Sequence, residues 1–135
     1  LKMLRNKVMN IAKDISTLLQ VITDNVYVDE MPDDETANCI TVYHSGGSRP
    51  DYFFGSEKQI ENPSIQIRVR HINRKDALDW CYQIKNILDG KSNFFINNNH
   101  YILVSLSSDI LNMGRDSQGR VHYSLNFAVQ VKRNI

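Results

Sequence analysis

Hydrophobic and polar residues alternate most clearly in the segment Ser64–Arg70. Its apolar positions are Ile65, Ile67 and Val69, and its polar positions are Gln66, Arg68 and Arg70. A period of two residues is typical of a strand with one face on a core and the other toward water. Pro63 has no N–H to donate to a neighbouring strand, which suits the start of a strand. The sequence therefore predicts a half-buried strand here.

The hydrophobic period lengthens to three and four residues directly after this strand. The apolar positions are now Ala77, Trp80, Cys81, Ile84, Ile87 and Leu88. This spacing predicts an amphipathic helix. Asn73 is a favourable N-cap, Asp76 lies in the first turn where a carboxylate is stabilised, and Gly90 suits the left-handed residue that ends a helix. We expect this helix to pack back onto the sheet that contains the strand.

The residues before this unit predict a helix and two strands. Met3–Ile22 keeps helical spacing, and we expect a long N-terminal helix that covers one face of the sheet. Asn25–Val28 is a short strand candidate, and Asn38–His44 is a better one because it is rich in β-branched and aromatic residues. The acidic segment between the two strands does not have the spacing or the glycine of an EF-hand loop, so a solvated turn is expected.

The residues after the helix predict a hairpin and a long last strand. Asn93–Ile96 and Tyr101–Leu106 should pair around the residues 97–100, because asparagine tolerates the left-handed backbone of tight turns. Arg120–Lys132 alternates over its whole length, and such a long strand is expected in the middle of an antiparallel sheet. The predicted fold class is α+β: residues 1–135 form a single domain, mainly an antiparallel β-sheet, with the long N-terminal helix and the second helix packed on it.

Two segments, Ser45–Asn62 and Asp109–Gln118, lack any hydrophobic period and are expected to be loops. The first contains Gly46, Gly47 and Gly55 together with a cluster of aromatic residues. Long loops in compact domains are usually functional or mobile, and exposed aromatic residues mark interaction sites. We predict that residues 45–62 form a mobile loop that docks on another copy or on a partner protein. Its contact residues would be Arg49, Tyr52, Phe53 and Phe54.

Composition narrows the function classes. The 135 residues are 41% hydrophobic and 23% charged, which are ordinary globular values. A net charge of +1 gives no overall field that would attract nucleic acid as the main partner. No apolar run reaches the roughly 20 residues that a helix needs to cross a bilayer, so no membrane is expected. Cys39 and Cys81 fall at positions predicted to be buried, which favours two buried thiols over a disulfide.

Recognisable catalytic, metal-binding and nucleotide-binding motifs are missing from the sequence. The histidines have no metal-ligand spacing; they are His44, His71, His100 and His122. There is no phosphate-binding glycine loop and no serine nucleophile elbow. We therefore expect no metal, no cofactor and no enzymatic activity. One charged cluster, Arg68–Lys75, is either a solvated face or a local basic surface that could meet a phosphate backbone.

Three sequence patterns together resemble a known family. They are the strand segment Pro63-Ser-Ile-Gln-Ile-Arg-Val-Arg70, the helix end Leu88-Asp-Gly90, and the turn Gly114-Arg-Asp-Ser-Gln-Gly-Arg120 before the strand Tyr123-Ser-Leu-Asn-Phe127. Their order and spacing resemble the minor capsid and tail terminator proteins of tailed bacteriophages and prophages. The resemblance covers most of the chain and is more distinct in its C-terminal half.

The resemblance implies a structural virion protein that forms a ring, commonly a hexamer. Such a ring caps the tail tube, ends tail elongation and provides the surface for head-tail joining. The implied partners are further copies of the chain, the tail tube protein and a head-completion or connector protein. DNA would pass through the lumen without sequence-specific binding, and Arg68, Arg70 and Arg74 are candidates to face it. The implied location is the tail or neck of the virion, after synthesis in the bacterial host cytoplasm.

Two other classes of function remain open from the sequence alone. A small α+β nucleic-acid-binding module would use the Arg68–Lys75 cluster, and its binding would weaken steeply with salt. An enzyme of another kind would need a deep pocket lined by titratable groups with perturbed pKa values.

Overall fold

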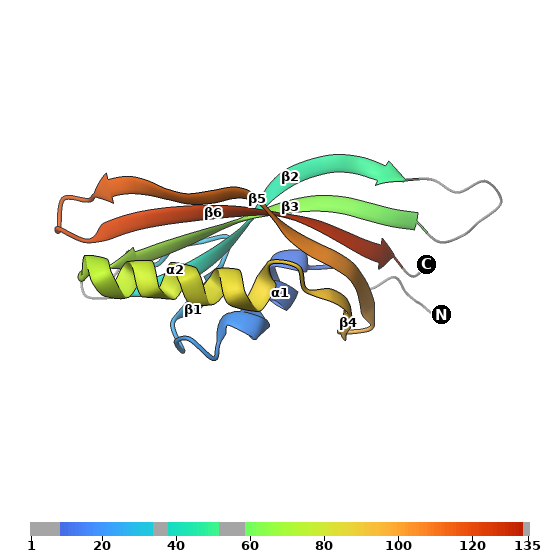
Figure 1. Ribbon diagram of the computed structural model, residues 1–135, viewed down its shortest axis with the longest axis horizontal. Helices are drawn as coiled ribbons and strands as arrows, with labels where there is room; N and C mark the ends of the chain where they lie inside the picture. Colours follow the sequence, from blue (N-terminus) through green and yellow to red (C-terminus); the bar gives the residue numbers. More distant parts are fainter. Residues whose placement is uncertain (1–8, 34–37, 52–58, 134–135) are drawn as a thin grey trace.

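The computed structural model describes residues 9–33, 38–51 and 59–133. These form one six-stranded sheet, in the order β1-β2-β3-β6-β5-β4, with two helices on the same side of it (Figure 1). All strand pairs are antiparallel except β1 with β2. The elements are α1 (Ile11–Leu19), β1 (Val26–Val28), β2 (Cys39–Asp51), β3 (Gln59–His71), α2 (Arg74–Leu88), β4 (Ser92–Ile96), β5 (Asn99–Arg115) and β6 (Val121–Arg133). The predicted α+β class and mainly antiparallel sheet are confirmed.

β3 and β6 form the centre of the sheet and the centre of the core. Their register sets Ile65 opposite Phe127, Ile67 opposite Leu125 and Val69 opposite Tyr123. Since side chains alternate across a strand, all six lie on one face, where they pack against the helices. The helix residues in this core include Ile15, Leu19, Ala77, Cys81, Ile84 and Leu88. The predicted central position of the last strand is confirmed. Among the predicted core residues, Trp80 is only partly buried and packs edge-on against His71.

α2 begins and ends close to where its sequence predicts. The side chain of Asn73 accepts a hydrogen bond from the backbone N–H of Asp76 at 3.1 Å, which caps the first turn. The helix ends at Leu88, and Gly90 follows with a φ of 81°. A left-handed residue at this point lets the chain turn directly into β4.

α1 is shorter than the predicted helix Met3–Ile22. Residues 3–8 of that prediction lie outside the described residues, and the described helix begins at Ile11. Its start is fixed by Asn10, whose side chain accepts from the Lys13 N–H at 3.0 Å. The helix stops at Leu19, and a turn bond from the Ile22 N–H to the Leu19 carbonyl follows. The apolar residues Leu18 and Ile22 still pack against the core.

Much of the predicted loop Ser45–Asn62 is strand, so that prediction is wrong for its described residues. β2 continues to Asp51 and β3 begins at Gln59, and the two pair through Ser48–Asn62 and Asp51–Ile60. Gly47 explains why the alternation disappears. Its φ is 118°, and a Cβ there would lie 2.3 Å from the Asn62 carbonyl oxygen, so a glycine bulge interrupts the strand without ending it.

The prediction of a loop over Asp109–Gln118 is also wrong for the residues up to Arg115, because β5 continues to that residue. β5 pairs with β6 through Leu111–Ser124 and Arg115–Val121, but its register shifts at several points between Leu106 and Arg115. Each shift moves the following side chains to the other face, and this removes the period of two from the sequence. The predicted hairpin of β4 and β5 is confirmed.

The longest strands give the molecule two distinct ends (Figure 1). We call the segments 45–51 and 59–64 the β2–β3 arm; it projects at one end, on the side where both termini lie. The turn between β5 and β6 lies at the opposite end, above the start of α2.

Phe127→Ala should lower the free energy of unfolding by about 3–5 kcal/mol, because the ring is fully buried and its removal leaves a cavity between sheet and helices. Phe95→Ala is the matched control: the ring is 67% exposed, and we expect a loss of no more than about 1 kcal/mol. Urea unfolding followed by circular dichroism measures both. Equal stability of wild type and Phe127→Ala would contradict the central position of Phe127.

Candidate functional site

The turn Asp116–Gly119 is organised by a single carboxylate. Asp116 Oδ1 accepts from the backbone N–H groups of Gln118 at 2.9 Å and Arg120 at 3.0 Å. Asp116 Oδ2 accepts from Arg120 Nε at 2.9 Å and from His122 Nε2 at 3.0 Å. Arg120 is 5% exposed, and its pairing with Asp116 compensates the burial of its charge. The sequence pattern Gly-Arg-Asp-x-x-Gly-Arg therefore encodes a rigid tip between β5 and β6.

The same contacts keep the Asp116 carboxylate ionised. The hydrogen bond from His122 is the largest cause, and together with the bonds from Arg120 and Gln118 it holds the pKa of Asp116 well below its usual range. Arg115, the last residue of β5, also stabilises the turn: its Nη1 donates to the Gly119 carbonyl oxygen. Sequence reasoning identified this turn but not that Asp116, Arg120 and His122 act as one cluster.

The predicted basic cluster Arg68–Lys75 is divided between two sides of the molecule. Arg68 and Arg70 lie on the sheet face away from the helices, because their neighbours Ile67 and Val69 point into the core. Arg74 is exposed in the first turn of α2, in the helix layer. The three residues do not form one continuous patch.

Arg70 is the residue that departs most from its prediction. Only 3% of it is exposed, and Nη1 donates to the Pro32 carbonyl oxygen at 2.6 Å. His71 is also buried, and this burial lowers its pKa. Arg68 is half-buried, and its guanidinium lies 6.0 Å from the ring centre of Tyr43. The prediction that Arg70 belongs to a water-facing surface is wrong, because the segment before β2 covers this part of the sheet.

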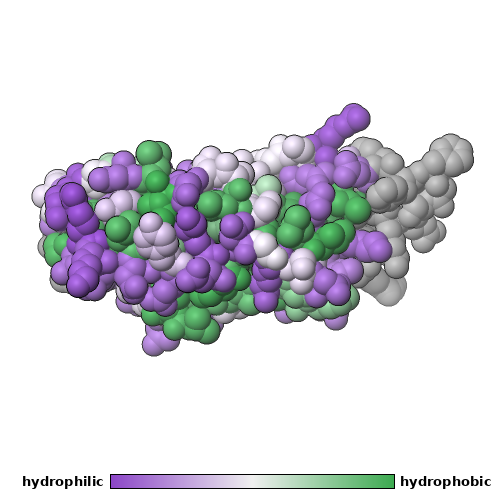
Figure 2. All heavy atoms as spheres, in the orientation of Figure 1, coloured by the Kyte–Doolittle hydropathy of each residue, from purple (hydrophilic) through white to green (hydrophobic). Residues whose placement is uncertain are grey.

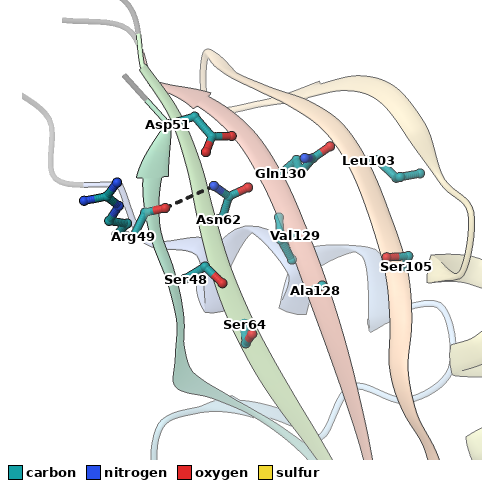
Figure 3. A pocket seen from close by; sticks show the side chains of 10 residues that line it. All are labelled: Ser48, Arg49, Asp51, Asn62, Ser64, Leu103, Ser105, Ala128, Val129 and Gln130. Carbon is teal, nitrogen blue, oxygen red and sulfur yellow. Dashed lines mark hydrogen bonds between the residues drawn. The ribbon is translucent and has the colours of Figure 1, made fainter. Parts of the chain in front are cut away.

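A groove of about 590 Å³ lies beside the β2–β3 arm, on the sheet (Figure 3). Its charged side chains are Arg49 and Asp51, both on β2, and the side chain of Asn62 donates to the Arg49 carbonyl oxygen at 3.2 Å. Three of its lining residues are serines: Ser48, Ser64 and Ser105. The lining is Ser48, Arg49, Asp51, Asn62, Ser64, Leu103, Ser105, Ala128, Val129 and Gln130.

This groove contains one of the predicted docking residues. Arg49 is exposed at its rim, whereas Tyr52, Phe53 and Phe54 lie outside the described residues. The groove is open, and Arg49 and Asp51 are the charged residues of its lining.

A buried carboxylate that the sequence analysis missed connects α1 to the β4–β5 hairpin. Asp14 is 2% exposed and accepts hydrogen bonds from Tyr101 Oη at 2.5 Å, Asn97 Nδ2 at 2.9 Å and Asn99 Nδ2 at 3.0 Å. Burial, together with the neighbouring Asp14 carboxylate, raises the pKa of Tyr101 well above its ordinary value. Three donors satisfy a charge that would otherwise be costly to bury, so this network has a structural role.

The described residues contain no group of three or more side chains arranged to hold a metal ion. Both cysteines are buried and unpaired, and burial raises the pKa of Cys81 to about 12, which makes its thiol unreactive. Among the described helices, none is both long and apolar enough to cross a bilayer.

The structure is that of a small α+β protein with one long, mostly antiparallel sheet and two helices on one side of it. The chain belongs to the family of bacteriophage tail terminator proteins, whose model matches residues 5–133. This family makes it a structural protein of the phage virion, and the resemblance found in the sequence is confirmed.

A solved structure supports the fold independently. The chain is similar to a protein in the virion of a native gene transfer agent particle, with a TM-score of 0.61 and 9% sequence identity, over 90% of this chain and 94% of that one. At this identity the similarity shows a shared fold. A search of curated proteins finds no match.

Asp116→Asn should destabilise the protein at neutral pH, and the difference from wild type should shrink as the pH falls below about 4. The sign follows from the lowered pKa: a carboxylate with a folded pKa below its unfolded value stabilises the fold above the unfolded pKa, and this contribution is lost on acidification. Chemical unfolding between pH 7 and pH 2 measures it. Asp24→Asn, at an exposed residue outside this turn, is the control and should show a much smaller difference. A difference that is independent of pH would contradict the role of Asp116.

Proposed function

We propose that this protein forms a ring, a hexamer, on the end of the phage tail tube. The ring ends tail elongation and provides the surface for head-tail joining. The observation that carries this proposal is the family match over residues 5–133.

The distribution of surfaces also supports a ring. A ring requires a heterologous contact, in which two different surfaces of each subunit meet. The β2–β3 arm and the β5–β6 tip lie at opposite ends of the molecule (Figure 1). The arm borders the groove with Arg49 and Asp51, whereas the tip contains the Asp116–Arg120 ion pair. Within the arm, we propose Arg49 as a contact residue, with Tyr52, Phe53 and Phe54 of the adjoining segment.

The remaining partners follow from the position of such a ring. One face would contact the tail tube protein and the other a head-completion or connector protein, so the protein would be found at the tail or neck of the virion. DNA would pass through the lumen, where a few basic side chains suffice because no sequence is read. Of the three candidates, Arg74 is exposed and Arg68 half-exposed in the single subunit, while Arg70 is engaged by Pro32.

A phage or prophage that lacks this protein should make tails of abnormal length that fail to join heads. The reason is that no cap would stop addition of tube subunits or present the joining surface. Electron microscopy of induced lysates measures tail length and the fraction of tails joined to heads, and expression of the wild-type protein in trans is the control.

Tails of normal length on filled heads would overturn the proposal. A monomer in solution would not bear on it, since the tube end can act as the template for assembly.

A further inference from the structure

The groove beside the β2–β3 arm opens on the face of the sheet that no helix covers. Its lining residues Ser64 and Ser105 point to that face, because their neighbours Ile65 and Val104 lie in the core. A volume of about 590 Å³ is in the range of sites that hold a compact ligand. The serine, asparagine and glutamine side chains of the lining provide both hydrogen-bond donors and acceptors.

A carboxylate gives the groove its charge. Figure 3 shows the Asp51 side chain over the groove, whereas the side chain of Arg49 points away from it. Asp51 is exposed, and no ion pair joins it to another of the described residues. A cationic group on a partner would therefore be favoured at this place.

The β5–β6 tip, residues 115–120, has the opposite charge. It contains two arginines and one carboxylate, which gives it a net charge of +1. Arg120 is buried in its ion pair with Asp116, so the exposed cation of the tip is Arg115. Arg115 uses Nη1 to bind the Gly119 carbonyl oxygen, but a guanidinium has five N–H donors, and the others can bind a carboxylate.

The tip is held in one conformation before any contact forms. Besides the four hydrogen bonds that the Asp116 carboxylate accepts, the Asp116 N–H donates to the Arg120 carbonyl oxygen at 2.9 Å. A preordered element loses little conformational entropy when it binds. Ser117 and Gln118 are exposed at its end, and their polar side chains suit a polar lining. Figure 2 shows many hydrophilic side chains, with hydrophobic ones among them, at the end of the molecule where the tip lies.

We propose that the β5–β6 tip of one subunit docks in the groove of a second copy of this chain, with Arg115 facing Asp51. This contact rests on the proposed ring, for which it supplies the surface between neighbouring subunits. The end of one subunit would then lie over the helix-free sheet face of the next. Polar side chains and one ion pair would hold the contact, rather than a large apolar area.

The occupant is a second copy rather than another partner because this chain carries both halves of the contact at its opposite ends (Figure 1). A contact between two tips would bring two exposed Arg115 side chains together and leave both grooves empty. A contact between tip and groove joins unlike surfaces, as a ring requires. It also leaves each subunit with a free tip or a free groove for the next neighbour until the ring closes.

Cysteine cross-linking on assembled tails tests this contact. Ser117→Cys places a thiol at the exposed end of the tip, and Ser48→Cys places one in the lining of the groove, while the natural cysteines are buried. Treatment of tails that carry the double variant with a short bis-maleimide should give a ladder of cross-linked subunits from the dimer upward. The matched control pairs Ser117→Cys with Ser92→Cys, an exposed serine on β4.

We expect at least about tenfold more cross-linking for the test pair than for the control pair, since adjacent thiols have an effective concentration in the millimolar range. Equal cross-linking of the two pairs, an equal yield from Ser117→Cys alone, or capped tails of normal length without any ladder would overturn the contact. The last result would leave the proposed capping function intact. Normal tails in the deletion phage would instead overturn that function, whatever the ladder shows.

Charge reversal tests the ion pair within the contact. Asp51→Arg should reduce the ladder of the test pair by at least about tenfold, because two cations would then face each other. Arg115→Glu in the same protein should restore the ladder, since the two charges are then exchanged. Asp24→Arg makes the same change of charge at an exposed residue outside both surfaces and should leave the ladder unchanged. A double reversal that unfolds in urea like the wild type but gives no ladder would overturn the contact.

Discussion

The register between β3 and β6 is the constraint on which the rest of the structure depends. It aligns Ile65 with Phe127 and Ile67 with Leu125 on the face that both helices cover. A slip of one residue would turn each of these side chains to the opposite face, where no helix lies. The helices can pack only if this pair is in register, and the β2–β3 arm and the β5–β6 tip continue strands whose direction this pair sets.

A sheet with helices on one side must protect its other face by different means. Thr41 and Ser124 are almost fully buried on that face, although they are small and polar. Long side chains lie there as well: Arg68 approaches the ring of Tyr43, and Arg70 reaches the Pro32 carbonyl oxygen. Arg70 covers part of the sheet, so its presence in the cluster Arg68–Lys75 is explained by its structural role in the fold. This residue therefore gives no indication of nucleic-acid binding.

The sequence predicts best the strands and helices whose hydrophobic period is uninterrupted, or whose ends are capped by a neighbouring residue. β6, the inner part of β3 and α2 keep their alternation or helical spacing throughout, and Asn73 fixes the start of α2 through its own side chain. The β4–β5 turn is predicted by its asparagines, because asparagine tolerates the left-handed backbone of tight turns. Asn97 and Asn98 do have positive φ values, 50° and 66°.

The outer parts of β2 and β5 could not be predicted, because glycine positions and bulges break the period while the strands continue. In the candidate site, features that depend on neighbouring residues could be predicted, and features that depend on distant residues could not. The Asp116 turn is local in sequence and could be recognised, although its hydrogen bonds could not. The burial of Asp14 depends on donors more than 80 residues away, so no local pattern reveals it. The division of Arg68 and Arg74 between two layers likewise depends on which face of β3 the helix covers.

The extended strands are easier to understand as parts of an assembly than as parts of a monomer. β2, β3 and β6 are each 13 residues long and β5 is 17, whereas the helices that cover the sheet have 9 and 15 residues. A sheet this long has more edge than the short strands β1 and β4 can pair, and unpaired edges favour association between molecules. The unpaired parts of β2 and β5 lie at opposite ends of the molecule, and both strands are interrupted by bulges. Bulges limit the length over which another strand can pair, so they favour limited pairing over indefinite aggregation. The ring that we propose on the tail tube would require this balance.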